Sequence, residues 1–258
     1  KKKEMKWQSF LLTIALSTSL SVSFAGEMPT GANVQSGNVK ITGKNTNHLV
    51  IDQSTNKSII NWDSFSIHDQ GRVDFNMPSS MSSSLNRVTG STPSSIAGQL
   101  NSNGKVMIIN PNGVVITKNG VVKTGSLTAS TLDINNEDFL KDKMNFIGSG
   151  KSKSIQNNGK IIIGDKGYGA LLGGQISNTG IVSARLGKIV LGAGEKITLD
   201  FAGDGLMSVS VPSEKLGIIK DINGNTLKSL ISNSGLLKAN GGIVKLSAAT
   251  AKNLSRSS

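Results

Sequence analysis

The sequence repeats itself in a way that leaves few folds open. Residues 177–193 match residues 232–248 at an offset of 55 without a gap, and seven of the seventeen positions are identical. A weaker third copy begins at Asn157, at an offset of 21 from Asn178. The shared unit is Asn-x-Gly, then a short aliphatic strand, then a turn with glycine and a second strand. A chain that repeats one short unit in this way stacks the units against one another.

The unit itself indicates a parallel β-helix. Asn and Gly tolerate the left-handed backbone angles of tight turns, and the aliphatic strands between them are too short to form a sheet alone. Stacked coils of about 20 residues let each strand bond to the next and bury the aliphatic side chains in one continuous core. A β-sandwich is the competing all-β fold, but it favours hairpins and larger aromatic residues, which make up only 4% of this chain.

Equivalent coils place equivalent residues in register. We therefore expect Ile189 and Val244 to point inward, and Lys188 and Lys245 to lie on strand flanks that face solvent. One acid-bearing stretch, Asn136–Asn145, has helical character and is predicted to form one or two turns within a loop. The segments that read most clearly as strands are Asn38–Thr42, Leu49–Asp52, Ser58–Ile67, Lys105–Ile109, Val114–Thr117, Lys160–Ile163, Ile189–Leu191 and Ile243–Leu246.

Residues 1–25 have the pattern of a secretory signal peptide. Four lysines precede the apolar run Phe10–Leu16, and Ser23-Phe24-Ala25 places small residues at the positions that a signal peptidase reads. The apolar run is too short and too rich in serine for a membrane-spanning helix, and a buried N-terminal helix is the alternative. We predict a mature N-terminus at or close to Gly26.

The positive charge does not indicate a nucleic-acid partner. The net charge of +12 falls to about +9 without residues 1–25, which hold four Lys and one Glu. The remaining lysines stand singly at strand ends and turns, whereas a nucleic-acid groove pairs a basic stripe with stacking rings. Isolated lysines discourage edge pairing and keep a β-rich surface soluble. A sulfated glycan or an anionic lipid surface is the alternative partner of such a surface.

The sequence predicts no catalytic, cofactor or metal site, and we expect the protein not to be an enzyme. The chain has no cysteine, and its two histidines, His48 and His68, are interpreted as residues of polar surface turns. A β-helix polysaccharide-binding protein or lyase is the rival class. A lyase needs acids clustered with Arg or Lys for calcium binding and proton abstraction, and here the acids are few and dispersed.

Six segments occur in an order that is typical of one family. They are Trp62, Phe65 and Ile67 in a W-x-x-F-x-I strand, Val73-Asp74-Phe75, Leu85-Asn86-Arg87-Val88, Asn110-Pro111-Asn112-Gly113, Ser126–Thr131 and Ile197–Phe201. With these motifs, residues from about 30 to 215 resemble the N-terminal secretion domain of two-partner-secretion exoproteins, the filamentous-haemagglutinin type. One departure is Met77-Pro78-Ser79-Ser80, where some members carry a second Asn-Pro-Asn turn.

The resemblance implies a right-handed parallel β-helix with an N-terminal capping sheet. It implies residues 26–215 as the secretion domain. Because the repeats run to the end of the chain, we expect residues 216–258 to be further coils of a truncated solenoid. A partner outer-membrane β-barrel transporter with periplasmic domains recognises such a domain, which then nucleates β-helix folding outside the cell. The whole protein is expected to be a secreted or cell-surface adhesin, with a host surface or glycan as its target. A secreted cytolysin or a contact-dependent toxin is the alternative, because these share the same leader domain.

The segment Asn110-Pro111-Asn112-Gly113 reads as a tight turn. Proline fixes φ at the second position, Asn-Gly readily takes positive φ at the next two, and the asparagine side chains can bond neighbouring backbone groups. Two roles are open to it: direct contact with the transporter, or formation of the fold that is competent for secretion. We favour the second.

Overall fold

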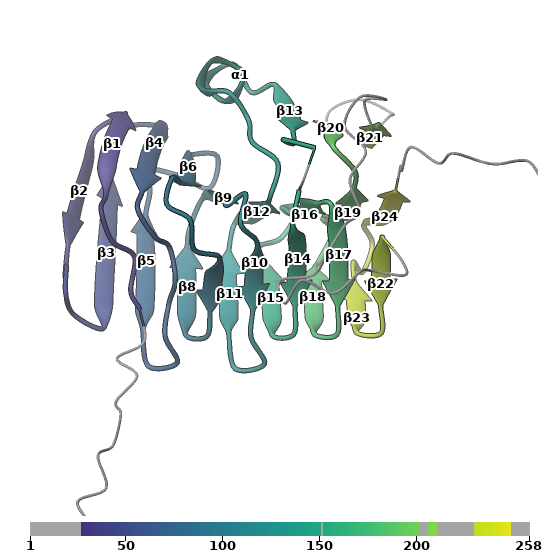
Figure 1. The fold of residues 1–258 in the computed structure, drawn as a ribbon, viewed down its shortest axis with the longest axis horizontal. Helices are drawn as coiled ribbons and strands as arrows, with labels where there is room; N and C mark the ends of the chain where they lie inside the picture. The colour runs from purple at the N-terminus through teal and green to yellow at the C-terminus, as the bar shows by residue number, and fades with distance from the viewer. Residues whose placement is uncertain (1–26, 151, 202–205, 211–229, 249–258) are drawn as a thin grey trace, which may run out of the picture.

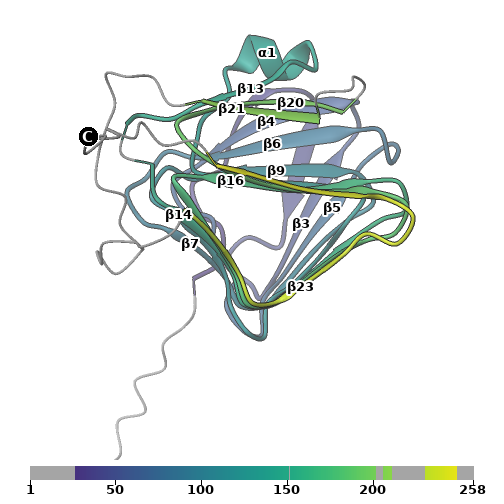
Figure 2. The same ribbon diagram turned by 90° about the vertical axis from the view of Figure 1, so that its right-hand side faces the viewer.

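The computed structural model describes residues 27–150, 152–201, 206–210 and 230–248. The predicted signal peptide and the predicted domain boundary at residue 215 lie outside these ranges. The described residues form a parallel β-helix with three faces, which Figure 1 shows from the side and Figure 2 along its length. The predicted all-β parallel β-helix is confirmed. The only helix among the described residues, α1 (Asn136–Leu140), is far too short to cross a membrane.

Three sheets, here called A, B and C, make the three faces. Sheet A contains, in spatial order, β1 (Asn33–Ser36), β4 (Lys57–Trp62), β6 (Ser83–Val88), β9 (Lys105–Ile109), β12 (Ser126–Ser130), β16 (Tyr168–Gly173), β19 (Lys188–Ala193) and β24 (Ile243–Ala248). Sheet B contains β2 (Val39–Thr42), β3 (His48–Gln53), β5 (Arg72–Asn76), β8 (Gln99–Ser102), β11 (Val121–Thr124), β15 (Lys160–Ile163), β18 (Ile181–Ala184) and β23 (Leu236–Lys238). Sheet C contains β7 (Ser94–Ile96), β10 (Val114–Ile116), β14 (Ser154–Asn157), β17 (Gln175–Asn178) and β22 (Ile231–Asn233).

The repeats predicted from the sequence are successive coils in register. Asn157 pairs with Asn178, and Asn178 pairs with Asn233, so the offsets of 21 and 55 are both preserved in sheet C. The three side chains form a ladder in which Nδ2 of each donates to Oδ1 of the next, at 2.7 Å in both steps. Because Asn157 and Asn178 are fully buried, the ladder satisfies polar groups that would otherwise be destabilising inside the helix.

The first coil is closed by two reversed strands. β1 pairs antiparallel with β4, and β2 pairs antiparallel with β3, whereas the later pairs within sheets A, B and C are parallel. Met28, Ala32, Val39 and Ile41 pack from this end against the inner core. These strands are the N-terminal cap. They cover an end that would otherwise present apolar side chains and unpaired backbone groups.

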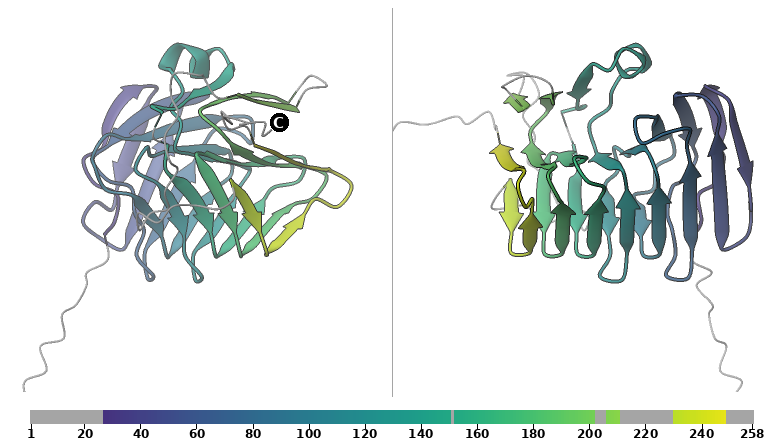
Figure 3. Two further views of the ribbon diagram at one scale, coloured as in Figure 1. Left: turned by 45° about the vertical axis from the view of Figure 1, so that its right-hand side comes forward. Right: turned by 180° about the vertical axis from the view of Figure 1, so that it is seen from behind.

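Two excursions leave the coil and return to it. The first follows β12 and contains α1 and β13 (Met144–Ile147); the second follows β19 and contains β20 (Lys196–Asp200) and β21 (Leu206–Ser210). β13, β20 and β21 form a small antiparallel sheet outside the β-helix (Figure 3). The second excursion separates β19 from β22, and it is the reason that the offset of 21 between two stacked asparagines becomes an offset of 55 at the next step.

The excursions create a second hydrophobic core, which the sequence analysis did not predict. The inner core fills the β-helix with residues such as Ile51, Val73, Leu100, Ile161 and Ile189. The second, here called the outer core, lies between the outward face of sheet A and the excursions. Its buried members are Ile59, Leu85, Met107, Ile109, Leu132, Ile134, Phe139, Phe146, Ala170, Leu172, Val190, Ile197, Leu199, Leu206 and Met207.

Several details of the strands differ from the sequence predictions. The predicted strand Ser58–Ile67 ends at Trp62, because the chain turns a corner there. Lys188 does not face solvent: it is half-buried, and its Nζ donates to the backbone oxygen of Phe201 in the second excursion. Val244 is in register with the buried Ile189, as predicted, but 41% of its surface is exposed, because no described strand of sheet A follows β24.

Candidate functional site

The tryptophan motif anchors the first coil from the inside. Trp62, Phe65, Ile67 and Phe75 are all buried in the inner core. The rings of Trp62 and Phe65 meet edge to face, with centroids 5.3 Å apart and planes at 83°. Such an edge-to-face pair is stabilised by electrostatic attraction between the rings, in addition to the hydrophobic stabilisation from burying them.

The motif Leu85-Asn86-Arg87-Val88 serves both cores because side chains alternate along a strand. Leu85 points into the outer core and Val88 into the inner core. The buried Asn86 accepts a hydrogen bond from Nε1 of Trp62 at 3.0 Å and donates to the hydroxyl of Ser84 at 3.2 Å. The indole N–H is therefore satisfied although it lies inside the protein.

Arg87 fastens the first excursion to sheet A. Its Nε donates to Oδ1 of Asp133 at 2.8 Å, one Nη to Oδ1 of Asn136 at 2.9 Å, and the other to the backbone oxygen of Ile134 at 2.6 Å. Only 15% of the arginine side chain is exposed, so these bonds form with little competition from water. The resemblance marked Arg87 as a motif residue, and the structure gives it this clamping geometry.

The segment Asn110–Gly113 forms the predicted turn, with one correction. Gly113 N–H donates to the backbone oxygen of Asn110 at 3.0 Å, and Asn112 N–H donates to Oδ1 of Asn110, also at 3.0 Å. Among the four residues, Gly113 has positive φ (118°), whereas Asn112 does not, contrary to the sequence prediction. The Asn110 side chain holds Asn112 in place without a left-handed backbone.

Motif residues that are distant in the sequence meet at one edge of the β-helix. We call this edge the motif corner; it consists of residues 62–65, 88–92 and 110–113. Trp62 pairs with Val88, and Arg87 pairs with Ile109, so three successive coils turn here together. The fully buried Asn110 donates from Nδ2 to Thr92 O at 3.0 Å and to the Ser94 hydroxyl at 2.9 Å.

The same corner requires a glycine and exposes a proline. Asn112 donates from Nδ2 to Gly90 O at 2.9 Å, which ties the turn to the coil before it. A Cβ at Gly90 would lie 2.1 Å from the backbone oxygen of Asp63, so a side chain cannot be accommodated there. Pro111, by contrast, is exposed. The polar groups of the turn are therefore directed into the fold, and its outer surface is formed mainly by Pro111 and the exposed residues of the 91–93 loop.

Sequence reasoning missed Glu195, which joins the two excursions. This buried carboxylate accepts hydrogen bonds from Gly150 N at 2.8 Å, Ser152 N at 3.1 Å and the Ser152 hydroxyl at 2.9 Å. Its backbone oxygen also accepts from Gly148 N at 2.7 Å. A lone Glu after a strand carries no sequence signal for this role, because its partners lie in a distant part of the chain.

The two histidines lie apart, and each has a partner. His68 is in a turn, as predicted, with Nε2 3.1 Å from Oδ1 of Asn47, but only 13% of its side chain is exposed, so it is not the surface residue that the sequence indicated. His48 is not in a turn: it begins β3, and its Nε2 lies 2.7 Å from Oδ2 of Asp74. Burial by itself raises the pKa of the Asp74 carboxyl, but hydrogen bonds from Arg72, Asn101 and His48, together with the charge of Arg72, outweigh it and hold that pKa below 3.8.

The low pKa of Asp74 predicts a specific acid sensitivity. The native state binds this proton less tightly than the unfolded state, so the ionised carboxylate stabilises the fold above the unfolded pKa of 3.8. That stabilisation is lost as the pH falls through the lower folded pKa. In urea unfolding, the free-energy difference between the wild type and Asp74→Asn should be largest above about pH 5 and should shrink toward about pH 2. If the free-energy difference between the two proteins stayed constant with pH, the pKa of Asp74 would not be lowered in the folded state.

Comparison with known proteins gives consistent matches. The family model described as the TPS secretion domain matches residues 25–257. A heme/hemopexin-binding protein of Haemophilus influenzae is 32% identical over 238 residues, covering 89% of this chain and 25% of that protein. A second protein of that description is 30% identical over 148 residues, or 57% of this chain and 16% of its own length. The chain thus spans about a quarter or less of these relatives.

A solved structure agrees in fold and in sequence. The crystal structure of the HMW1 secretion domain from Haemophilus influenzae matches with a TM-score of 0.70 and 31% identity. The match covers 85% of this chain and 56% of that one.

Proposed function

Because this chain belongs to the family of TPS secretion domains, we propose that its motif corner serves export by holding the fold that the partner transporter recognises. As a two-partner-secretion domain, the chain is exported across the outer membrane with the help of a partner outer-membrane transporter. Export is supported by the match of the family model to residues 25–257. The sequence within this range contains the six motif segments described above.

We propose that the turn Asn110–Gly113 acts in secretion through the fold. Its asparagines direct their polar groups to Thr92, Ser94 and Gly90 of the preceding coil, and Asn110 is fully buried. A buried side chain with satisfied hydrogen bonds has nothing to offer an incoming partner. The turn contributes to secretion by stabilising the corner where two successive coils meet, and so the fold as a whole.

The capped N-terminal end supports a template role for the domain. That end is closed by the antiparallel strands β1 and β2, against which the later coils stack in parallel. A stack of coils grows by adding each coil to an existing end. We therefore propose that folding proceeds coil by coil from the capped end and that this direction helps to drive export.

The role of the longer protein is a further proposal. We propose a surface adhesin that acts on a host surface or glycan, with a cytolysin or contact-dependent toxin as the alternative. A binding role is favoured because the two matched relatives are described by what they bind, heme and hemopexin, rather than as toxins. We also propose that the domain works by folding and recognition rather than by catalysis, since its motif residues are engaged in packing and in backbone contacts.

Export with the partner transporter tests this function. When the chain is co-expressed with its transporter, it should appear in the medium. Without the transporter, no secreted chain should be detected. Asn110→Ala removes several buried hydrogen bonds, so it should lower the free energy of unfolding by about 1–3 kcal/mol and reduce export in parallel.

A surface variant of the same corner is the matched control. Thr92 is exposed, and its side chain can be enlarged and charged without loss of the bond that its backbone accepts from Asn110. Thr92→Glu should leave both stability and export nearly unchanged. If Thr92→Glu abolished export at an unchanged melting temperature, the corner would be a direct transporter contact and the proposal of a purely structural role would be wrong.

A further inference from the structure

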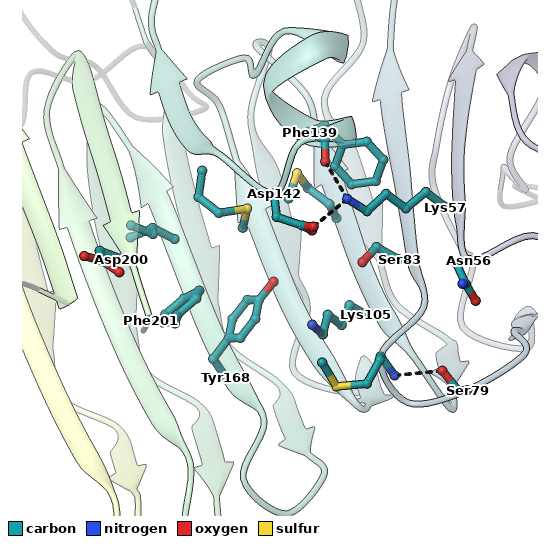
Figure 4. A pocket seen from close by; sticks show the side chains of 14 residues that line it. Asn56, Lys57, Ser79, Ser83, Lys105, Phe139, Asp142, Tyr168, Asp200 and Phe201 are labelled. Atoms are coloured by element: carbon teal, nitrogen blue, oxygen red, sulfur yellow. Dashed lines mark hydrogen bonds and ion pairs between the residues drawn. The ribbon is translucent and has the colours of Figure 1, made fainter. Parts of the chain in front are cut away.

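A pocket of about 500 Å³ opens on the outward face of sheet A, away from the motif corner. Its floor comes from β4, β6, β9 and β16, and its walls come from the two excursions and from the loop before β6, which contributes Ser79 and Met81 (Figure 4). The outer core closes its inner side through Met107, Phe139 and Leu199. The excursions, which fold back over the sheet, therefore enclose much of the pocket.

A register row across sheet A explains why the surface is hollow. Lys57, Ser83, Lys105 and Ser126 are register neighbours on four adjoining strands, and Tyr168 N on the next strand donates to the Ser126 hydroxyl at 3.1 Å. The small side chain of Ser83 leaves a gap beside Lys105 that forms part of the pocket, whereas Ser126, on the other side, is buried. In a close-packed protein such gaps are normally filled.

The two lysines in this row differ in their partners. Lys57 Nζ donates to Oδ2 of Asp142 and to the backbone oxygen of Leu140, both at 2.7 Å, so its charge is neutralised within the first excursion. Lys105 is half-buried, and among the described residues no hydrogen bond or ion pair reaches its Nζ. Figure 4 places Asp200, the other carboxylate of the pocket, beyond Phe201 and on the far side of Tyr168 from Lys105. A half-buried cation without a counter-charge favours an anion beside it.

The remaining walls are apolar and adaptable. Tyr168 stacks on Phe201 with ring centroids 4.1 Å apart. Three methionines, Met81, Met107 and Met144, line the same space, and 72% of the surface of Met81 is exposed. Met81 is thus an exposed, flexible thioether of the kind found on surfaces that accommodate apolar ligands, whereas Met107 is buried in the outer core. Burial raises the pKa of Tyr168 to about 12, so its hydroxyl stays protonated at neutral pH and can donate a hydrogen bond.

We propose that this pocket binds a small amphipathic carboxylate, such as a medium-chain fatty acid. Lys105 Nζ pairs with the carboxylate, and the Tyr168 hydroxyl is the second donor. The methionines and the Phe139 and Phe201 rings contact the hydrocarbon chain. A carboxylate on an apolar chain matches a site that offers one unpaired cation and several thioethers and rings within a volume suited to a small ligand.

Binding of decanoate to the full chain tests the proposal, with decanol as the uncharged analogue. Decanoate should bind at one site per chain, measured by calorimetry, and decanol should bind at least about tenfold more weakly, because the charge-assisted hydrogen bond is missing. Lys105→Met keeps most of the length of the side chain but removes the charge. This variant should bind decanoate more weakly than the wild type by a similar factor. Lys123→Met, an exposed lysine on sheet B, is the control and should have no effect.

Methyl labels on methionine locate the ligand independently of affinity. Decanoate should shift the NMR signals of the Met81, Met107 and Met144 methyl groups, whereas that of Met77, which lies in the inner core, should not move. Equal affinity of the wild type and Lys105→Met, equal affinity for decanoate and decanol, or shifts confined to other methionines would each overturn the proposal. None of these outcomes depends on export, so a failure here leaves the secretion function untouched.

Discussion

Replacing Ile161 with Asp should destabilise the domain by several kcal/mol, whereas the same change at Ile162 should cost about half a kcal/mol or less. The two residues are neighbours in β15 and differ only in the face on which they lie. Ile161 is fully buried in the inner core, whereas 39% of the surface of Ile162 is exposed. An aspartate at position 161 has no partner among the surrounding apolar side chains. At position 162 it lies beside Lys123, its register neighbour in β11.

Urea unfolding of the two variants measures the difference, and hydrogen exchange shows its extent. Each coil contacts mainly the coils before and after it, so the Ile161→Asp lesion should reduce protection most in β11, β15 and β18. Protection around Trp62 and Phe75 should be reduced least. Uniform loss of protection across the chain would mean that the stack unfolds as one cooperative unit. Similar destabilisation by both variants would contradict the assignment of the two faces.

Replacing Trp62 with Ala should cost about 3–5 kcal/mol, which is a large part of the total stability of a domain. The indole is buried against Phe65, and its removal leaves a cavity in the first complete coil, next to the cap. It also leaves Oδ1 of the buried Asn86 without the donor it has now. Because the cap and the motif corner both rest on this coil, export through the transporter should fall with stability.

Trp62→Phe separates packing from hydrogen bonding. It retains an aromatic ring against Phe65 but removes the N–H group that donates a hydrogen bond to Asn86. The free energy of unfolding should therefore fall by about 1–3 kcal/mol, which is less than for Trp62→Ala. Thermal or urea unfolding of both variants gives the order. If Trp62→Ala were destabilised by less than Trp62→Phe, the tryptophan would not be the anchor of the first coil that its burial indicates.

The turn at Asn110–Gly113 shows how far local sequence rules reach. Proline, asparagine and glycine fixed the position of the turn, because each restricts or extends the backbone of its own residue. They did not fix the backbone angle of Asn112, which follows from hydrogen bonds to Asn110 and to Gly90 of another coil. Turn rules use only neighbouring residues, so they cannot predict the conformation of a residue whose hydrogen-bond partner belongs to another coil.

Lys188 is a second residue whose environment the sequence did not predict. Its position in the repeat is in the correct register, but its exposure was wrongly predicted, because the partner that covers it is Phe201 in the second excursion. The repeat specifies which residues stack. It does not specify what folds over the outside of the stack.

The sequence by itself determined the β-helix, since short aliphatic strands and Asn-x-Gly turns that recur at offsets of 21 and 55 encode the strands, the tight turns and their register. These offsets align Asn157, Asn178 and Asn233, and the structure adds the hydrogen bonds between their side chains. Only the tertiary structure decided the outer core, the clamps at Arg87 and Glu195, and the pocket around Lys105. These features join segments that are far apart in the chain through single contacts. Such contacts depend on where the folded coils place their side chains, and they leave no periodic trace in the sequence.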